Sequence, residues 1–70
     1  SRRGKYMAVL DLIRELQEEY PDGVPIRKLI EVAREKNISE EFVYDVVNKE
    51  LRKGTLYQPK PGRYKLVPGF

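Results

Sequence analysis

The sequence predicts an α+β fold that is mainly helical, with three helices followed by a C-terminal β-hairpin. Apolar residues recur with the 3,4 spacing of amphipathic helices in three successive segments, at about residues 5–19, 26–36 and 40–53. Residues 54–67 alternate instead around a turn that contains proline and glycine, as two short strands do. Three helices that end in such a hairpin are typical of a winged helix-turn-helix, the fold class that we predict.

The first predicted helix runs from about Lys5 to Glu19 and ends at a Pro-Asp-Gly turn. One stripe of this helix is apolar and is expected to face the core: Tyr6, Val9, Leu10, Ile13, Leu16 and Tyr20. Residues 1–4 are polar and basic, and we interpret them as a linker or the remnant of one. The predicted winged-helix domain therefore covers residues 5–70.

The second predicted helix begins next to Pro25, whose missing N–H costs nothing in a first helical turn. A very short strand at Gly23-Val24 is a candidate third strand. The inward residues of the helix are expected to be Ile26, Leu29, Ile30 and Ala33. Asn37 and Ile38 form the turn that follows, because asparagine tolerates left-handed geometry.

The third predicted helix has a signal at each end. Ser39 is a favourable N-cap, and Gly54 is the expected left-handed C-cap. Its buried stripe is predicted to be Phe42, Val43, Val46, Val47 and Leu51. The hairpin then comprises a strand at Thr55–Gln58, a loop at Pro59–Arg63 and a strand at Tyr64–Val67.

Length and composition exclude several classes of site. A chain of 70 residues forms one domain, and this one has no cysteine or histidine for a disulfide, a nucleophile–base pair or a zinc site. It has no Gly-rich phosphate loop, and its carboxylates are spread along amphipathic helices beside Lys and Arg. We therefore predict no catalytic residue, no cofactor and no metal in this chain. No apolar run has the length of about 18 residues that a membrane span needs.

The positive charge is concentrated near the C-terminus. Residues 1–48 carry 8 basic and 10 acidic side chains, whereas residues 49–70 carry 6 basic side chains and 1 acidic one. The net charge of the whole chain is +3. Lys60 and Arg63 flank Pro61-Gly62, so we expect both to project past the hairpin tip, with Lys65 pointing outward from the second strand. Such a wing contacts the phosphate backbone of DNA, which fixes the position of the protein on the duplex and does not read the base sequence. The alternative is that these cations only keep an edge strand soluble.

The outer face of the third helix carries Tyr44, Asn48 and Arg52 at i, i+4 and i+8, where residues can reach base edges in a major groove. Three carboxylates at the start of the helix, Glu40, Glu41 and Asp45, would repel phosphates. We therefore expect weak, largely sequence-independent DNA binding, or a protein partner on this helix. Solvated polar side chains are the plain alternative.

The hairpin resembles the C-terminal winged-helix domain of archaeal MCM replicative helicases. The matching residues are Leu51-Arg52-Lys53-Gly54, Leu56-Tyr57, Pro59-Lys60-Pro61-Gly62, Tyr64-Lys65 and Val67, and the helix and turn at Ile26–Ser39 are also similar. The likeness covers about Tyr6 to Val67, and only Tyr-x-x-Lys-Pro-x-x-Tyr is distinctive. It implies a parent that is an ATP-driven, hexameric DNA helicase, with its ATPase motifs outside this chain, and a tethered domain that modulates ATPase and unwinding activity.

Three hypotheses follow for the function. The first is a regulatory domain with weak DNA affinity, whose candidate nucleic-acid-binding residues are Asn48, Lys49, Arg52, Lys53, Lys60, Arg63 and Lys65. The second is a domain that docks another replication protein through Tyr44, Asp45 and Asn48. The third is a sequence-specific transcription regulator, for which the acidic helix start and the missing dimerisation element are unfavourable. We expect a monomer when the domain is isolated, contacts with other domains of its own hexamer, no membrane partner, and a cytoplasmic, nucleoid-associated location.

Overall fold

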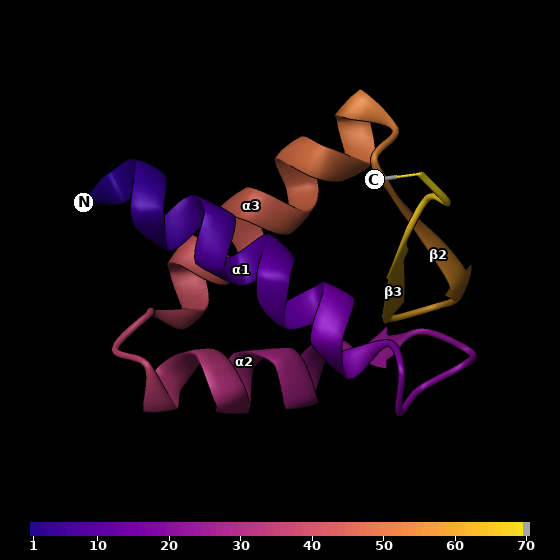
Figure 1. Ribbon diagram of the computed structural model, residues 1–70, viewed down its shortest axis with the longest axis horizontal. Helices are drawn as coiled ribbons and strands as arrows, with labels where there is room; N and C mark the ends of the chain where they lie inside the picture. The colour runs from indigo at the N-terminus through magenta and orange to yellow at the C-terminus, as the bar shows by residue number, and fades with distance from the viewer. Residues whose placement is uncertain (70) are drawn as a thin grey trace.

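Three helices and a small antiparallel sheet follow one another in the computed structural model, which describes residues 1–69 (Figure 1). The elements are α1 (Arg2–Leu16), β1 (Val24–Pro25), α2 (Ile26–Glu35), α3 (Glu40–Lys53), β2 (Leu56–Lys60) and β3 (Arg63–Leu66). The predicted mainly helical winged-helix fold is confirmed. Phe70, the predicted end of the domain, lies outside the described residues.

Local caps set the ends of the helices. The Ser39 hydroxyl accepts a hydrogen bond from the Phe42 N–H at 3.1 Å, and Gly54 adopts a left-handed φ of 82°, as predicted. The first helix differs from its prediction, because Ser1 caps it by accepting from the Gly4 N–H at 3.1 Å. Helix α1 therefore begins three residues before Lys5 and ends at Leu16 rather than at Glu19. That a linker joins the chain to another domain stays a prediction.

The sheet has the strand order β1-β3-β2, so the predicted short strand does form, one residue later than expected. The predicted loop at Pro59–Arg63 is wrong: only Pro61 and Gly62 lie between β2 and β3. The register shifts by one residue between Tyr57 and Lys60, so the bulge contains Pro59. A proline is tolerated there because a bulge leaves one residue without a ladder hydrogen bond.

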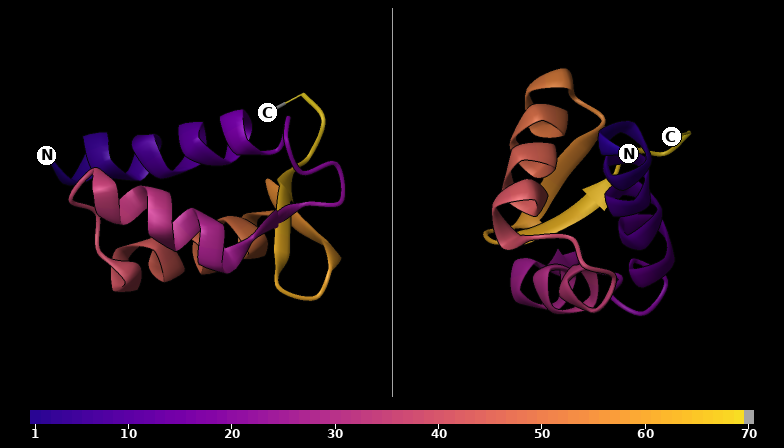
Figure 2. Two further views of the ribbon diagram at one scale, coloured as in Figure 1. Left: turned by 90° about the horizontal axis from the view of Figure 1, so that it is seen from below. Right: turned by 90° about the vertical axis from the view of Figure 1, so that its left-hand side faces the viewer.

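The core lies where the three helices and the sheet meet. Seen end on, the helices surround a common centre, and the sheet stands across one end of them (Figure 2). The buried apolar residues are Val9, Leu12, Ile13, Leu16, Val24, Leu29, Ile30, Ala33, Ile38, Val43, Val46, Val47, Leu56 and Leu66. Phe42 and Leu51, which were predicted to be buried, are half-buried at the rim, and the turn residue Ile38 joins the core.

Candidate nucleic-acid interface

The three cations of the wing are held by the turn that connects α1 to β1. Lys60 Nζ lies 3.2 Å from Asp22 Oδ2, Arg63 Nη1 donates to the Gly23 carbonyl at 3.1 Å, and Lys65 Nζ donates to the Pro21 carbonyl at 3.1 Å. The expectation that Lys60 and Arg63 project past the hairpin tip is therefore wrong in this structure. Lys65 is half-buried rather than directed freely outward.

Strand pairing brings this turn to the wing. Val24 pairs with Tyr64 and Pro25 with Arg63, so the residues just before β1 lie against β3. Gly23 is buried there with a φ of 104°, and a Cβ atom at this position would lie 2.9 Å from Arg63 Cβ. A glycine is needed because both the left-handed backbone and the close approach exclude a side chain.

The basic end of α3 is built around a buried carboxylate, Glu50, which is not among the predicted site residues. Glu50 is only 3% exposed. Its carboxylate accepts hydrogen bonds from the Tyr6 hydroxyl at 2.5 Å and the Thr55 hydroxyl at 2.5 Å, and Lys53 Nζ lies at 3.1 Å. These three donors come from α1, the start of the wing and α3. Glu50 therefore ties the first helix to the end of the third and to the wing.

The ionisation of this cluster follows from its surroundings. Burial disfavours the charged form of Glu50, but the hydrogen bonds from Thr55, Tyr6 and Lys53 and the charge of Lys53 outweigh it, and the pKa of Glu50 lies below its ordinary value. Burial, together with the hydrogen bond to the Glu50 carboxylate and its charge, raises the pKa of Tyr6 to about 12, although Arg52 opposes this. At neutral pH Glu50 is charged and Tyr6 is a neutral donor.

Two further cations of α3 lie beside this cluster and face solvent. Lys49 Nζ is 6.0 Å from the centroid of the Tyr6 ring, at the outer limit of a cation–π contact. Arg52 is exposed and close enough to influence the pKa of Tyr6. Among residues 1–69, neither Lys49 nor Arg52 forms an ion pair.

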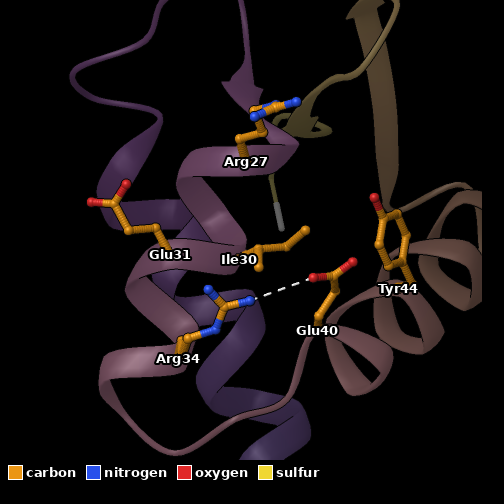
Figure 3. A pocket seen from close by; sticks show the side chains of 6 residues that line it. All are labelled: Arg27, Ile30, Glu31, Arg34, Glu40 and Tyr44. Carbon is orange, nitrogen blue, oxygen red and sulfur yellow. Dashed lines mark hydrogen bonds and ion pairs between the residues drawn. The ribbon is translucent and has the colours of Figure 1, made fainter.

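The start of α3 has a different character. Tyr44, Asn48 and Arg52 are exposed, as predicted, and so are the carboxylates of Glu40, Glu41 and Asp45. A groove of about 510 Å³ separates this part of α3 from α2 (Figure 3). Its lining residues are Arg27, Ile30, Glu31, Arg34, Glu40 and Tyr44. Arg34 and Glu40 bridge the groove at 3.5 Å, so its charges largely compensate one another.

The structure thus brings Lys49, Arg52 and Lys53 together at one end of α3, and holds the wing cations separately on the turn at Pro21–Gly23. Glu50 had a signal in the sequence, because it follows Val43, Val46 and Val47 at helical spacing and so falls on the buried stripe.

Other kinds of site find no support in the part of the chain that the structure describes. Within residues 1–69, no group of three or more carboxylates is placed to hold a metal ion. In the same range, no helix combines the length and the apolar character that crossing a membrane requires.

Comparison with known proteins agrees with the fold. The chain matches the family model of the MCM protein C-terminal winged helix-turn-helix domain over residues 1–67. Two uncharacterized MCM-type proteins of Methanocaldococcus jannaschii are 34% and 35% identical, over 93% and 96% of this chain respectively. The chain spans 9% of the length of each of these relatives. No solved structure matches it. The chain belongs to the family of winged helix-turn-helix domains that occur at the C-terminus of MCM proteins.

Proposed function

We propose that this chain is an accessory domain of a replicative MCM helicase, which it regulates while contacting DNA weakly and without sequence preference. One observation carries the DNA contact. Residues 49–66 hold six cationic side chains and a single carboxylate, and that carboxylate, Glu50, is buried and hydrogen-bonded instead of facing solvent. The outer surface of this segment is therefore almost purely cationic.

The charge gradient along α3 supports contact with a backbone more than base reading. The first turns present Glu40, Glu41 and Asp45, whereas the last turns present Lys49 and Arg52. A helix that reads a major groove places its N-terminal residues at the base edges. Carboxylates at that position repel the neighbouring phosphates, so the C-terminal half of α3, together with the wing, is the better contact.

The regulatory part of the proposal rests on the family. The ATPase motifs, and with them ATP binding and unwinding, belong to other parts of the parent protein, a hexamer in this proposal. This domain acts as a tethered contact that engages DNA or a neighbouring domain and thereby changes the activity of the parent. A cytoplasmic, nucleoid-associated location, and a monomeric state for the isolated domain, belong to the same proposal.

DNA titration at several salt concentrations tests the contact. Neutralising about four phosphates gives a slope of log affinity against log salt near −3.6, because each contact contributes about −0.9. Two duplexes of unrelated sequence should give the same slope and similar affinities. The absence of any chemical shift change in the labelled chain at low salt and high DNA concentration would contradict DNA binding. A strong preference for one duplex would favour a transcription regulator instead.

The α2–α3 groove supports a second candidate, a docking site for another replication protein. Tyr44 is 39% exposed on its rim, next to Asp45 and within one turn of Asn48. An exposed aromatic side chain beside a groove is typical of a protein interface. Replacing Tyr44 with Ala should weaken assembly with the partner and leave DNA affinity unchanged, whereas Lys49→Ala should do the reverse. Loss of DNA affinity in the Tyr44 variant would count against this second function.

A further inference from the structure

The first turn of α1 adds cations beside α3, near Phe42 in the first turn of that helix and, through Tyr6, near Lys49 and Arg52. The guanidinium carbon of Arg2 lies 5.1 Å from the centroid of the Phe42 ring, and Tyr6 is bonded to Glu50. The N-terminal half of α1 therefore runs against α3, as the crossing of the two helices shows (Figure 1). Arg2 and Arg3 line one shallow hollow together with Tyr6 and Met7.

We call this surface the α1–α3 face and define it by Arg2, Arg3, Tyr6, Lys49 and Arg52. Its four cations are exposed, and none of them forms an ion pair with another of the residues 1–69. No acidic residue lies in the first turn of α1, and the carboxylate at the centre, Glu50, is already bonded to Tyr6 and Thr55. None of these cations is therefore neutralised by an ion pair, and Asp45, one turn before Lys49 on α3, is the exposed carboxylate nearest to Lys49 along that helix.

The wing differs in this respect. Each of its three cations already has an oxygen partner on the Pro21–Gly23 turn. A phosphate that approached the wing would compete with these partners, whereas on the α1–α3 face it would displace only water and counterions.

We propose that the α1–α3 face binds the phosphodiester backbone of DNA and carries more of the contact than the wing does. This inference rests on the proposed DNA-binding function and relocates its main surface. About 10 Å of B-DNA axis carries about six phosphate charges. Four cations on two adjacent helices therefore suit a row of phosphates better than a single small anion.

A protein partner is the less favoured occupant of this face. An acidic peptide needs an apolar anchor as well as cations, and the exposed apolar surface here is mainly that of Met7, which is 49% exposed. The hollow beside it is lined by two arginines. The face offers four exposed cations but only one large exposed apolar side chain, which favours a polyanion.

The test compares three double variants in fluorescence-anisotropy titrations of a labelled duplex between about 50 and 200 mM salt. The first, Arg2→Gln with Arg3→Gln, removes two charges from the α1–α3 face. The second, Lys60→Gln with Lys65→Gln, removes two from the wing. The control, Arg14→Gln with Arg34→Gln, removes the same net charge from exposed ion pairs elsewhere. Circular dichroism establishes that each variant is folded.

We expect the first variant to make the salt slope shallower by about 1.8, at about 0.9 per lost phosphate contact, and to lower affinity at least about tenfold at 50 mM salt. The wing variant should change the slope by less than about 0.9, and the control should leave it unaltered. If the wing variant loses binding while the Arg2/Arg3 variant keeps it, the relocation is wrong and the proposed function stands. If the wild-type chain binds no duplex at low salt, both proposals fail.

A Glu-rich amphipathic peptide serves as the competing probe. Tighter binding of this peptide than of duplex, lost on Met7→Ala, would assign the α1–α3 face to a protein partner and overturn the proposal. Weak peptide binding that is insensitive to Met7→Ala would agree with a site for phosphates.

Discussion

We call the cluster of Glu50 with Tyr6, Thr55 and Lys53 the α1–α3 junction. Both this junction and the wing place cations beside oxygen atoms, but in opposite ways. At the junction the oxygen is a buried carboxylate, and its closest partners, Tyr6 and Thr55, are neutral hydroxyls. At the wing the oxygens belong to a surface turn, and their partners are the cations themselves. The Glu50 charge thus stabilises the fold and leaves Lys49 and Arg52 available to a ligand, whereas the cations of the wing stabilise the Pro21–Gly23 turn.

This difference predicts which substitutions change the stability of the fold and which change its binding to DNA. Buried hydrogen bonds to a charged group contribute substantially to stability, whereas an exposed ion pair contributes between about 0 and 1 kcal/mol. Changes at the junction should therefore affect mainly the free energy of unfolding, and changes in the exposed ion pair of the wing should affect mainly the interaction with DNA.

The largest effect is expected at Glu50. Glu50→Ala leaves the Tyr6 and Thr55 hydroxyls without their acceptor and opens a cavity, so we expect a loss of about 2–4 kcal/mol in the free energy of unfolding by urea. Glu18→Ala, on an exposed residue of the chain, is the matched control and should change it by less than about 0.5 kcal/mol. Equal effects of the two substitutions would remove Glu50 from its structural role.

The same residue gives an acid dependence. The pKa of Glu50 in the folded chain is lower than its ordinary value of 4.5, so folding favours the charged form. Its contribution is present above about pH 4.5 and is lost as the pH falls through the folded value. The difference in stability between the wild-type chain and Glu50→Gln should therefore shrink below pH 4.5. A difference that stays constant down to the acid transition would contradict this assignment.

The next effect concerns the turn that holds the wing. Gly23→Ala places a Cβ atom 2.9 Å from Arg63 Cβ at a φ of 104°, and we expect a loss of roughly 2–3 kcal/mol from backbone strain and overpacking together. Gly54→Ala is the control, because its φ of 82° is also left-handed but no atom lies within 4 Å. It should cost about 1 kcal/mol, the strain alone. Thermal unfolding of both variants separates crowding from strain.

The contrast between the two regions also shows what the sequence can predict. Ser39, Asn37 and Gly54 carry local signals, and the structure uses them as N-cap, left-handed turn and C-cap. The position of Glu50 on the apolar stripe of the third helix predicts that it is buried. The sequence does not indicate which residues form hydrogen bonds with its carboxylate. Tyr6 is 44 residues away in sequence.

The wing was less predictable, for a related reason. The strand pattern identified the hairpin, but the direction of a long cation depends on acceptors that only the tertiary structure supplies. The acceptors of Lys60, Arg63 and Lys65 lie 38 to 44 residues away in the chain. The basic, polar composition of residues 1–4 predicts a linker, although these residues form the first turn of α1. The only sequence signal for that turn is the single N-cap residue Ser1.

A smaller effect is expected for the donor side of the junction. Tyr6→Phe removes one hydrogen bond to the Glu50 carboxylate and keeps the ring in place, so we expect a loss of about 1–2 kcal/mol at neutral pH. The pKa of Tyr6 is raised from 10.0 to about 12 in the folded chain. Its contribution is therefore full below pH 10 and is lost as the pH rises toward 12. Unfolding measured between these values should show the two chains converging, and parallel curves would contradict the assignment.

The smallest effect on stability is expected at the ion pair between the wing and its turn. Asp22→Asn should change the free energy of unfolding by less than about 0.5 kcal/mol, because Asp22 and Lys60 are both largely exposed. It releases Lys60, so DNA affinity should rise and the salt slope should steepen by up to about 0.9. Asp11→Asn is the matched control: it breaks the exposed pair with Arg14 and adds the same net charge away from the wing. Only Asp22→Asn frees a wing cation. Equal salt slopes for the two variants would therefore mean that the ion pair between Asp22 and Lys60 does not reduce DNA binding. The contrast between the wing and the junction would then depend on Glu50 alone.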